Sequence, residues 1–363
     1  MASGPSLPAQ AIDVLEVDAE SAYPTTTPGP RVRVAAYAPF LHDHAVELRF
    51  SSHLSASEYR VLGSAGDRVA KARLIAASAV RVARKARPID TPLMVHRLLS
   101  LIPVPARDPP AHVAVYDFDD ALFHGSISSQ NRSFRMLKRE SERCHAYLRR
   151  ARLVLAGNAY LASYARGYAR HVEIVPSCVD PASQPLRKHA DAEIVTVGWM
   201  GSPSTAAYLR TILPVFADLN RDRVRLQLIT VGAGPLPPEP WLQQLPWTGE
   251  SEAALLASFD IGVMPLPDNP WTRGKCGYKL LQYGAAGVPA IANPVGVNRE
   301  ILANGGGIAA RSSAEWKGAL ELFAADSVAR REAGLQGRRL VEREYSYQRW
   351  APELAAMLRS VST

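Results

Sequence analysis

Two separate series of short apolar segments that alternate with helical segments constrain the fold of this chain more than any other feature. The first series includes the apolar runs at residues 46–51, 113–116 and 153–156. The second series begins at residues 194–199, a nearly continuous apolar run of the kind that forms a buried parallel strand. Strands that alternate with helices form parallel sheets covered by helices. The sequence therefore predicts an α/β fold with two doubly wound domains.

A polar segment at residues 180–191 separates the two series and contains two prolines, Pro181 and Pro185. This composition is typical of an interdomain linker. We therefore expect an N-terminal domain over residues 1–180 and a C-terminal domain over residues 191–345. Apolar residues at three- and four-residue spacing predict helices, which include residues 31–44, 57–86, 131–150, 159–168, 252–258 and 278–286.

The composition excludes several classes of protein. Hydrophobic residues make up 47% of the chain and charged residues 21%, so the chain can build cores and is not disordered throughout. No apolar run reaches the roughly 18 residues of a transmembrane helix, and the first ten residues do not read as a secretory signal. The three cysteines show no CxxC spacing, which argues against a disulfide framework or a zinc site. A reducing, cytoplasmic location fits this cysteine usage.

The excess of positive charge, formally +8, is concentrated in the first half of the chain. Residues 59–107 contain ten basic residues and only two acidic ones, and residues 132–152 hold a second basic cluster. Such a surface attracts phosphates, acidic lipids or nucleic acids. The expected helix at 57–86 is basic and amphipathic, so it can pack on the sheet or contact an anionic membrane from the cytoplasmic side. A solvated helix face is the alternative, and the sequence carries no RNA-module or zinc pattern that favours nucleic acid.

The turn after residues 194–199 carries glycine and hydroxyl groups close to the start of an expected helix. Ligands of open α/β sheets bind beyond the carboxyl ends of the strands, where such turns lie. Backbone N–H groups at a helix N-terminus attract anions, and hydroxyl groups can add donors. A serine at this place can instead act only as a helix N-cap. Phosphate binding at Gly201, Ser202 and Thr205 and simple capping by Ser202 or Ser204 are therefore both open.

A second loop combines glycines and cations directly before an expected helix. Arg273, Lys275 and Gly277 precede the helix at 278–286, and a lysine with free backbone amides can hold a phosphate there. Gln282 follows Lys275 by two helical turns, so both side chains can face one cleft. An exposed basic loop is the alternative. We expect a phosphate site at this loop. Lys279, one helical turn further along, can bind the same ligand with a smaller effect or can be simply solvated.

A third cluster, Asp117 to Asp120 followed by His124, lies at the end of the strand expected at residues 113–116. Carboxylates at a strand end suggest general acid–base catalysis or metal ligation, and capping is the alternative. A phosphatase-type pattern is not formed, because Ala121 stands where threonine or valine would be needed. We expect Asp119, Asp120 or His124 to act on a substrate, and we expect no bound metal.

Four motifs of the C-terminal half, taken in order, resemble those of glycosyltransferase family 4, a group of retaining enzymes with the GT-B fold. The motifs are GWMGSPST, TVGAG, TGESEAALLASFDIGVMPLP and WTRGKCGYKLLQYGAAGVPAIANPVGVNREI. The N-terminal half is similar to the family chiefly at the segment YDFDDALF. The resemblance covers roughly residues 191–345 and implies two Rossmann-like domains that face a central cleft.

The resemblance also implies what each domain binds. The C-terminal domain would bind a nucleoside-diphosphate sugar, and the N-terminal domain would bind a hydroxyl acceptor on a glycan, a glycolipid or a secondary metabolite. The last helix, at residues 346–363, would cross back onto the N-terminal domain. No metal or other cofactor is implied, so protein groups must meet the charge of the diphosphate. The implied donor-binding residues are Gly201, Ser202, Thr205, Arg273, Cys276, Gly277, Tyr278, Lys279, Gln282 and Glu300.

The sequence departs from the family pattern in two features. The family often carries two glutamates eight residues apart, and Gly274 and Gln282 stand in their places. Gln282 can still bond ribose hydroxyls. The family also often carries cations after the first strand of this domain, and Lys275, with Arg273, would replace them.

The interpretation that results is a retaining glycosyltransferase in which Lys275 stabilises the leaving diphosphate. Asp119, Asp120 or His124 would orient the acceptor. Two alternatives stay open. One is a nucleotide-sugar epimerase or phosphorylase with the same architecture, and the other is a basic protein that binds nucleic acid or a membrane.

Overall fold

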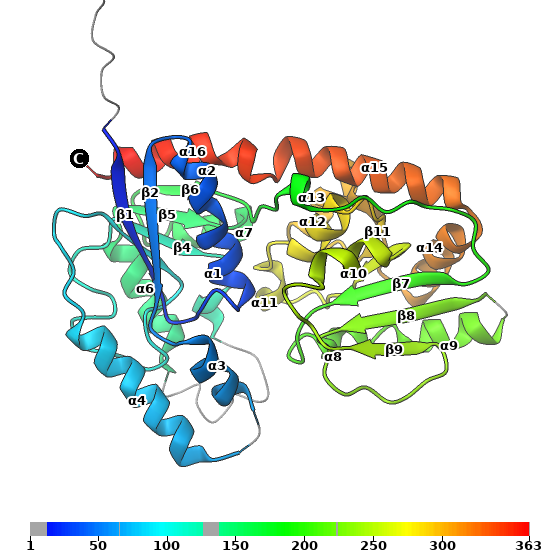
Figure 1. Ribbon diagram of the computed structural model, residues 1–363, viewed down its shortest axis with the longest axis horizontal. Helices are drawn as coiled ribbons and strands as arrows, with labels where there is room; N and C mark the ends of the chain where they lie inside the picture. The colour runs from blue at the N-terminus through cyan, green and yellow to red at the C-terminus, as the bar shows by residue number, and fades with distance from the viewer. Residues whose placement is uncertain (1–12, 65, 126–137, 223, 363) are drawn as a thin grey trace, which may run out of the picture.

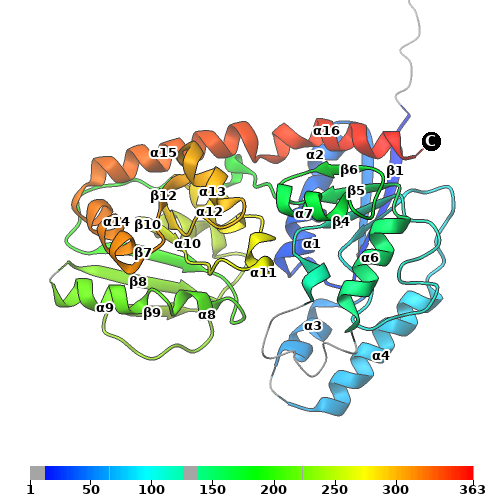
Figure 2. The same cartoon turned by 180° about the vertical axis from the view of Figure 1, so that it is seen from behind.

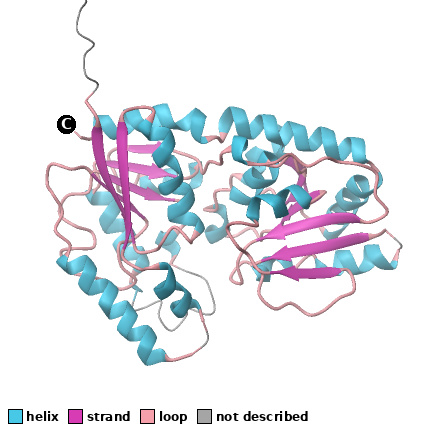
Figure 3. Cartoon of the chain, in the orientation of Figure 1, coloured by secondary structure: helices cyan, strands magenta, loops and turns pink. Residues whose placement is uncertain are grey.

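The structure, a computed structural model, describes residues 13–64, 66–125, 138–222 and 224–362. It contains two six-stranded parallel sheets, one in each half of the chain, and helices flank both sheets (Figure 1, Figure 3). Hydrophobic clusters fill both faces of each sheet. This architecture confirms the predicted fold of two doubly wound, Rossmann-like halves.

In each sheet the strand order changes direction beside the first strand of its half. The first sheet has the order β2-β1-β3-β4-β5-β6 and the second β12-β11-β10-β7-β8-β9, so the changes fall between β1 and β3 and between β7 and β10. Ligands of doubly wound sheets bind beyond the carboxyl ends of the strands at such points. The strands are β1 (Leu15–Ser21), β2 (Val46–Ser52), β3 (Leu93–His96), β4 (Val115–Phe118), β5 (Leu153–Ala156), β6 (Val172–Ile174), β7 (Val195–Met200), β8 (Leu226–Val231), β9 (Leu242–Leu245), β10 (Ile261–Met264), β11 (Ala290–Ala292) and β12 (Gly307–Ala309).

Each half has its own set of helices. The first half carries the pair α3 and α4, which projects from its lower end in Figure 1. The helices of the first half are α1 (Pro28–Arg33), α2 (Ala38–His42), α3 (Ala56–Gly63), α4 (Arg68–Arg84), α6 (Glu140–Arg150) and α7 (Ala159–Ala165), with 3-10 turns at Ala35–Tyr37, Leu122–His124 and Pro181–Ser183. The remaining helices are α8 (Ala206–Leu209), α9 (Leu213–Arg221), α10 (Glu252–Ser258), α11 (Pro270–Arg273), α12 (Tyr278–Ala285), α13 (Asn298–Ile301), α14 (Ser313–Ala325), α15 (Ser327–Glu344) and α16 (Tyr347–Ser360), with a π-helical turn at Leu302–Gly306.

The last helix, α16, returns to the first sheet. It continues the line of α15 across both halves and lies beside α2 (Figure 1, Figure 2). Leu354 and Leu358 are buried in the same cluster as Val17 of β1, and the Tyr347 hydroxyl donates to the Val32 carbonyl at 3.1 Å. Two crossings of the chain, at the linker and at α16, therefore join the halves.

Some predicted helices are interrupted. The predicted helix at 31–44 is divided into α1, a 3-10 turn and α2, because Pro39 lies in the first turn of α2 and lacks the N–H group that a continuous helix needs. The predicted helix at 57–86 ends at Gly63 and restarts at Arg68, where the Asp67 carboxylate accepts from the Val69 amide at 2.7 Å. The start of the helix predicted at 131–150 lies outside the described residues.

Two elements are not predicted from the sequence. The edge strand β9 carries two glutamines between its leucines, so it shows no apolar run. The short helix α11 begins at a capping box in which Asn269 and Thr272 exchange hydrogen bonds. By contrast, β5 has the predicted bounds, because a strand buried on both faces is apolar at every position.

The basic stretch at 59–107 is partly neutralised by carboxylates from other segments. Arg81 pairs with Glu58, Lys85 and Arg87 pair with Glu20, and Arg97 pairs with Asp119 and Asp120. The net charge of the folded surface is therefore lower than the sequence of this stretch suggests. Among the described residues, no helix combines the length and the hydropathy that a bilayer crossing requires.

The Glu20 carboxylate at the end of β1 makes the protein sensitive to acid. Glu20 is 1% exposed and lies 2.8 Å from His53 Nε2, 2.8 Å from Arg87 Nη2 and 3.0 Å from Lys85 Nζ. Burial raises the pKa of Glu20, but the bonds from His53 and Arg87 and the charges of Arg87 and Lys85 outweigh it and lower the pKa to about 2. The stabilisation is therefore present above the unfolded-state pKa of about 4.3 and is lost as the pH falls toward 2.

We expect the free energy of unfolding to fall by about 2–3 kcal/mol between pH 4.5 and pH 2 through this group. Urea unfolding measured across that range tests the expectation. In Glu20→Gln the same pH range should show a flatter decline, because the titrating group is gone. An unchanged slope in that variant would assign the acid sensitivity to other carboxylates.

Candidate functional site

A buried charge network anchors the carboxyl ends of β3 and β4. The Asp117 carboxylate accepts from Arg33 Nε at 3.2 Å and faces His96 Nδ1 at 2.7 Å. Arg33, His96 and Asp117 are each no more than 2% exposed. Burial raises the pKa of Asp117, but the charge of Arg33 and the bond from His96 outweigh it and hold the pKa below its usual range. Asp117 therefore stays ionised and holds together the carboxyl ends of β3 and β4, which form the rim of the first sheet.

Asp119 and Asp120 follow this anchor and share one arginine. Arg97 Nε donates to Asp119 Oδ1 at 2.6 Å, and the second carboxylate, Asp120 Oδ2, lies 2.6 Å from Arg97 Nη2. Burial raises the pKa of Asp119, but Arg97 outweighs it and holds the pKa well below the usual range. A carboxylate held ionised in this way is a poor proton acceptor at neutral pH. Asp119 is therefore unsuited to act as a general base.

The loop from Gly274 to Gly277, between α11 and α12, packs directly on this rim. A Cβ atom on Gly274 would stand 2.7 Å from Ala121 Cβ, so only glycine allows this approach. Cys276 Sγ donates to the Asp119 carbonyl at 3.3 Å, and the Asn158 amide donates to the Lys275 carbonyl at 3.0 Å. The Cys276 thiol is thus buried between the two halves, and burial raises its pKa. Its side chain serves packing, which leaves only its backbone for a ligand.

Lys275 and Lys279 extend from this loop and the first turn of α12. Lys275 Nζ donates to Asp120 Oδ1 at 2.6 Å, so a carboxylate of the first half compensates a cation of the second. Lys279 Nζ lies over the Trp199 ring, 5.5 Å from its centroid, and within the described ranges it makes no hydrogen bond or ion pair. Burial and the neighbouring Lys275 lower the pKa of Lys279 to about 8, against the opposing effect of Asp120.

Of the two alternatives for Lys279, the structure does not show a simply solvated side chain. The helix places it partly buried against Trp199, one turn from Lys275, and the two ammonium groups lie close enough to affect each other's charge. An ammonium group held in this position without an anionic partner favours an anionic ligand.

The turn after β7 lies beside Trp199. A Cβ atom on Gly201 would stand 2.5 Å from the Trp199 ring. Thr205 Oγ1 donates to the Ser202 carbonyl at 3.0 Å and accepts from the Ser202 amide at 3.2 Å. Thr205 is the N-cap of α8 but makes no side-chain capping bond, so the capping alternative is not realised. The exposed Ser202 hydroxyl hydrogen bonds the Ser204 hydroxyl at 2.9 Å.

Gln282 follows Lys279 by three residues on α12 and meets a carboxylate. Its Nε2 donates to Glu252 Oε1 at 2.9 Å, and Glu252 Oε2 also accepts from Trp247 Nε1 at 2.7 Å and Arg31 Nη2 at 3.1 Å. Of these side chains, Arg31, Glu252 and Gln282 border a cavity of about 190 Å³ between the halves. It is lined by Arg31, Val32, Ala36, Val179, Asp180, Ser183, Gln184, Glu252, Tyr278, Gln282 and Tyr347.

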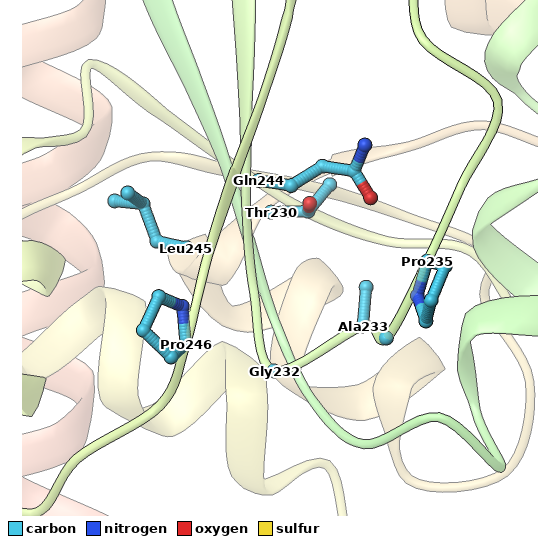
Figure 4. A pocket seen from close by; sticks show the side chains of 8 residues that line it. Thr230, Gly232, Ala233, Pro235, Gln244, Leu245 and Pro246 are labelled. Carbon is cyan, nitrogen blue, oxygen red and sulfur yellow. The ribbon is translucent and has the colours of Figure 1, made fainter.

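A second cavity, of about 300 Å³, lies at the carboxyl ends of β8 and β9 (Figure 4). Gly232 to Pro235 line it on one side, and Gln244 to Pro246 line it on the other. A Cβ atom on Gly232 would stand 2.4 Å from the Gly201 carbonyl, so this cavity adjoins the turn after β7.

Two further predicted site residues, Arg273 and His124, bond side chains other than Lys275 and Lys279. Arg273 is half exposed and pairs with Asp268 at 2.6 Å, and Glu300 is exposed on α13. His124 Nε2 lies 2.8 Å from the Tyr160 hydroxyl, and burial lowers the pKa of His124. Gly277, with φ of +66°, holds the left-handed conformation before α12.

Sequence reasoning missed His96, Arg97, Arg31 and Glu252. His96 and Arg97 end an apolar strand, which is a signal that could have marked them as rim residues. Glu252 reads as an ordinary first-turn glutamate of α10, and Arg31 reads as one of many arginines. Their roles depend on contacts across the two halves, which local patterns do not show.

Comparisons with known proteins agree with this architecture. Residues 191–326 match the family model described as Glycosyl transferases group 1. No curated protein sequence matches the chain significantly.

Several solved structures share the fold. The sucrose-phosphate synthase of Thermosynechococcus elongatus superposes with a TM-score of 0.67 at 13% identity, over 96% of this chain and 99% of that chain. WaaG, a glycosyltransferase involved in lipopolysaccharide biosynthesis, gives 0.61 at 12% identity, over 95% of this chain and 99% of that one. HepE of Anabaena, in complex with UDP and glucose, gives 0.59 at 14% identity, over 94% and 99%. The chain therefore has the GT-B fold, and its second half matches the glycosyl transferases group 1 over residues 191–326.

Proposed function

We propose that the protein is a retaining glycosyltransferase that moves a sugar from a nucleoside diphosphate to a hydroxyl acceptor. The observation that carries the proposal is the pair of ammonium groups, Lys275 and Lys279, at the start of α12. They lie beside the turn that follows β7 and against the rim of the first sheet. A leaving diphosphate placed there would meet two cations and the amides of the helix start.

Each half then has a distinct role in the proposal. The second half would bind the nucleotide sugar, as the family match at residues 191–326 supports. The first half would bind the acceptor at the rim formed by Asp119 and Asp120. The HepE structure holds UDP and glucose, and uridine diphosphate is therefore among the first nucleotides to test.

The reaction would depend on stabilisation of developing charge. The bond between the anomeric carbon and the diphosphate oxygen lengthens, and Lys275 and Lys279 neutralise the charge that gathers on the diphosphate. The sugar passes through an oxocarbenium-like state. The acceptor hydroxyl attacks from the same face and gives its proton to the departing phosphate oxygen. Asp120, which already bonds Lys275, would hold the acceptor close to this oxygen.

A thermal-shift experiment with a panel of nucleoside diphosphates tests the donor half of the proposal. We expect UDP or GDP to raise the melting temperature in the presence of EDTA, because protein cations meet the diphosphate charge. Adenosine and cytidine diphosphates complete the panel. Stabilisation that requires a divalent cation would contradict the metal-independent form of the proposal, and no shift with any nucleotide would contradict the donor site.

The projecting pair α3 and α4 favours a second role, peripheral contact with an anionic membrane. Val69 and Val80 are 57% and 45% exposed on α4, and Arg68, Arg73 and Arg84 are exposed on the same helix. Exposed apolar groups among cations suit an anionic lipid surface.

Co-sedimentation with vesicles of phosphatidylglycerol and phosphatidylcholine tests this contact. We expect the wild-type protein to bind, and binding to weaken at least tenfold when Arg68, Arg73 and Arg84 become glutamate. Equal charge reversal of Arg210, Arg311 and Arg331, which are exposed in the second half, is the control. Equal losses in both variants would show a non-specific charge effect and would contradict a membrane-facing α4.

The alternatives differ in their products. A nucleotide-sugar epimerase would convert one nucleotide sugar to another or release free sugar without an acceptor, and a phosphorylase would form a sugar phosphate. Product analysis by NMR separates these outcomes from transfer to a hydroxyl.

A further inference from the structure

We infer that Glu252 is a positioning residue that fixes the amide of Gln282 so that its oxygen, and not its nitrogen, is presented to the nucleotide. This inference rests on the proposed function, because it assigns how one side chain of the donor site is set. It concerns the cavity of about 190 Å³ between the halves, which both residues line.

The first step is the direction of the hydrogen bond between the two side chains. Gln282 is 7% exposed and Glu252 is 9% exposed, so both are largely removed from water. An ionised carboxylate can only accept hydrogen bonds, whereas an amide has one accepting and one donating end. The contact of 2.9 Å therefore requires the Gln282 nitrogen to face Glu252. The amide oxygen is left over, and within the described residues it accepts no hydrogen bond.

The second step is what holds Glu252 itself. Trp247 Nε1 donates to Glu252 Oε2 at 2.7 Å from the second half. Arg31 Nη2 reaches the same oxygen at 3.1 Å from α1 of the first half, and its guanidinium lies 5.2 Å from the centre of the Trp247 ring. The carboxylate thus has a charged partner at its largely buried position. Because donors from Trp247 and Arg31 hold Glu252 in place, Glu252 in turn fixes the amide of Gln282.

The third step is the chemistry that the cavity selects. Gln282 presents only an acceptor, as a glutamate would, but without a negative charge. A hydroxyl group, which donates, satisfies it. Two further polar atoms of the lining, Arg31 Nε and Gln184 Oε1, are buried without a partner within the described parts of the chain. Unsatisfied donors and acceptors around a small cavity suit a polyhydroxylated group, and the ribose of the nucleotide is the one that the proposed function supplies.

An exchange of the two side chains tests the inference. In Gln282→Glu, two carboxylates face each other at about the distance of a hydrogen bond, and we expect the Kd for UDP or GDP to rise at least tenfold. In Glu252→Gln, either end of the Gln282 amide can face the ligand, and we expect a rise of about tenfold. In the double variant an amide at 252 faces a carboxylate at 282, so the acceptor is restored and we expect a Kd within threefold of wild type.

Binding is measured by titration calorimetry on the full chain in EDTA, with inorganic pyrophosphate as a second ligand. Pyrophosphate has no ribose, so its Kd should stay within about twofold of wild type in all three variants. Gln336→Glu, at an exposed position on α15, is the matched charge control.

The outcomes separate the inference from the function on which it rests. Failure of the wild type to bind any nucleoside diphosphate overturns the proposed function and with it this role of Gln282. Nucleotide binding in the wild type, with a double variant as weak as the worse single variant, overturns the inference alone. Equal losses for nucleotide and pyrophosphate also overturn it, because they would show general damage to the site.

Discussion

Replacing Lys275 with alanine is expected to lower turnover about 10²–10³-fold, because the variant lacks one of the two cations that the proposed function assigns to the leaving diphosphate. The affinity for a nucleoside diphosphate should fall more than the affinity for the bare nucleoside. The fold should persist, since the Lys275 side chain is 23% exposed and Asp120 keeps its contact with Arg97. Steady-state kinetics with the nucleotide sugar selected by thermal shift measure the effect.

Asp120→Asn tests whether Lys275 binds the diphosphate or only joins the two halves through its ion pair with Asp120. If Lys275 served only to pair with Asp120, removing the carboxylate charge would reproduce the loss seen in Lys275→Ala. We expect instead that Asp120→Asn keeps nucleotide affinity and impairs transfer. Lys188→Ala, at an exposed lysine of the linker, should leave both unchanged.

Lys279 is expected to share the role of Lys275 and to give it a pH dependence. Its pKa is lowered to about 8, and an ammonium group is charged only below its pKa. The affinity for a nucleoside diphosphate should therefore decline as the pH rises past about 8. In Lys279→Met the affinity should be low at neutral pH and should lose this decline. For Lys275, wild-type turnover in Lys275→Ala would show that the diphosphate binds at another place.

Replacing Arg33 with methionine is expected to destabilise the protein by about 3–5 kcal/mol, which is the usual result of leaving one charge of a buried ion pair without its partner. Asp117 would keep only His96, and the Val175 carbonyl would lose the 2.6 Å bond from Arg33 Nη1. Urea unfolding at neutral pH measures the change.

The double variant Arg33→Met with Asp117→Asn is the control for this prediction. It removes both charges, so it should recover part of the stability that the single variant loses. A single variant within 1 kcal/mol of wild type would contradict the description of Asp117 as a buried, ionised anchor.

The sequence was sufficient to predict the fold because buried parallel strands and amphipathic helices leave strong periodic patterns. Residues 153–156 and 252–258 coincide with β5 and α10 for this reason. Helix breaks were less predictable. Pro39 divides the region around α2, and Asp67 starts α4 by a capping bond that competes with a continuous apolar pattern.

The contacts of the candidate site could not be predicted in the same way. Asp120 and Lys275 are separated by 155 positions, and Arg31 and Glu252 by 221. Each of these side chains has a plausible local role in its own segment, as a strand-end carboxylate, a loop cation or a helix-start charge. They become partners through the packing of the two halves, of which the close approach of Gly274 to Ala121 is one contact.

The most direct test of the account identifies the bond that the protein breaks in a nucleotide sugar. Purified protein is incubated in EDTA with uridine and guanosine diphosphate sugars, with and without simple glycoside acceptors, and the products are followed by NMR. We expect a nucleoside diphosphate together with a sugar product that keeps the donor's anomeric configuration. This product should be lost in Lys275→Ala but not in Lys188→Ala. Nucleoside monophosphate with sugar phosphate, or an inverted anomer, would contradict the account.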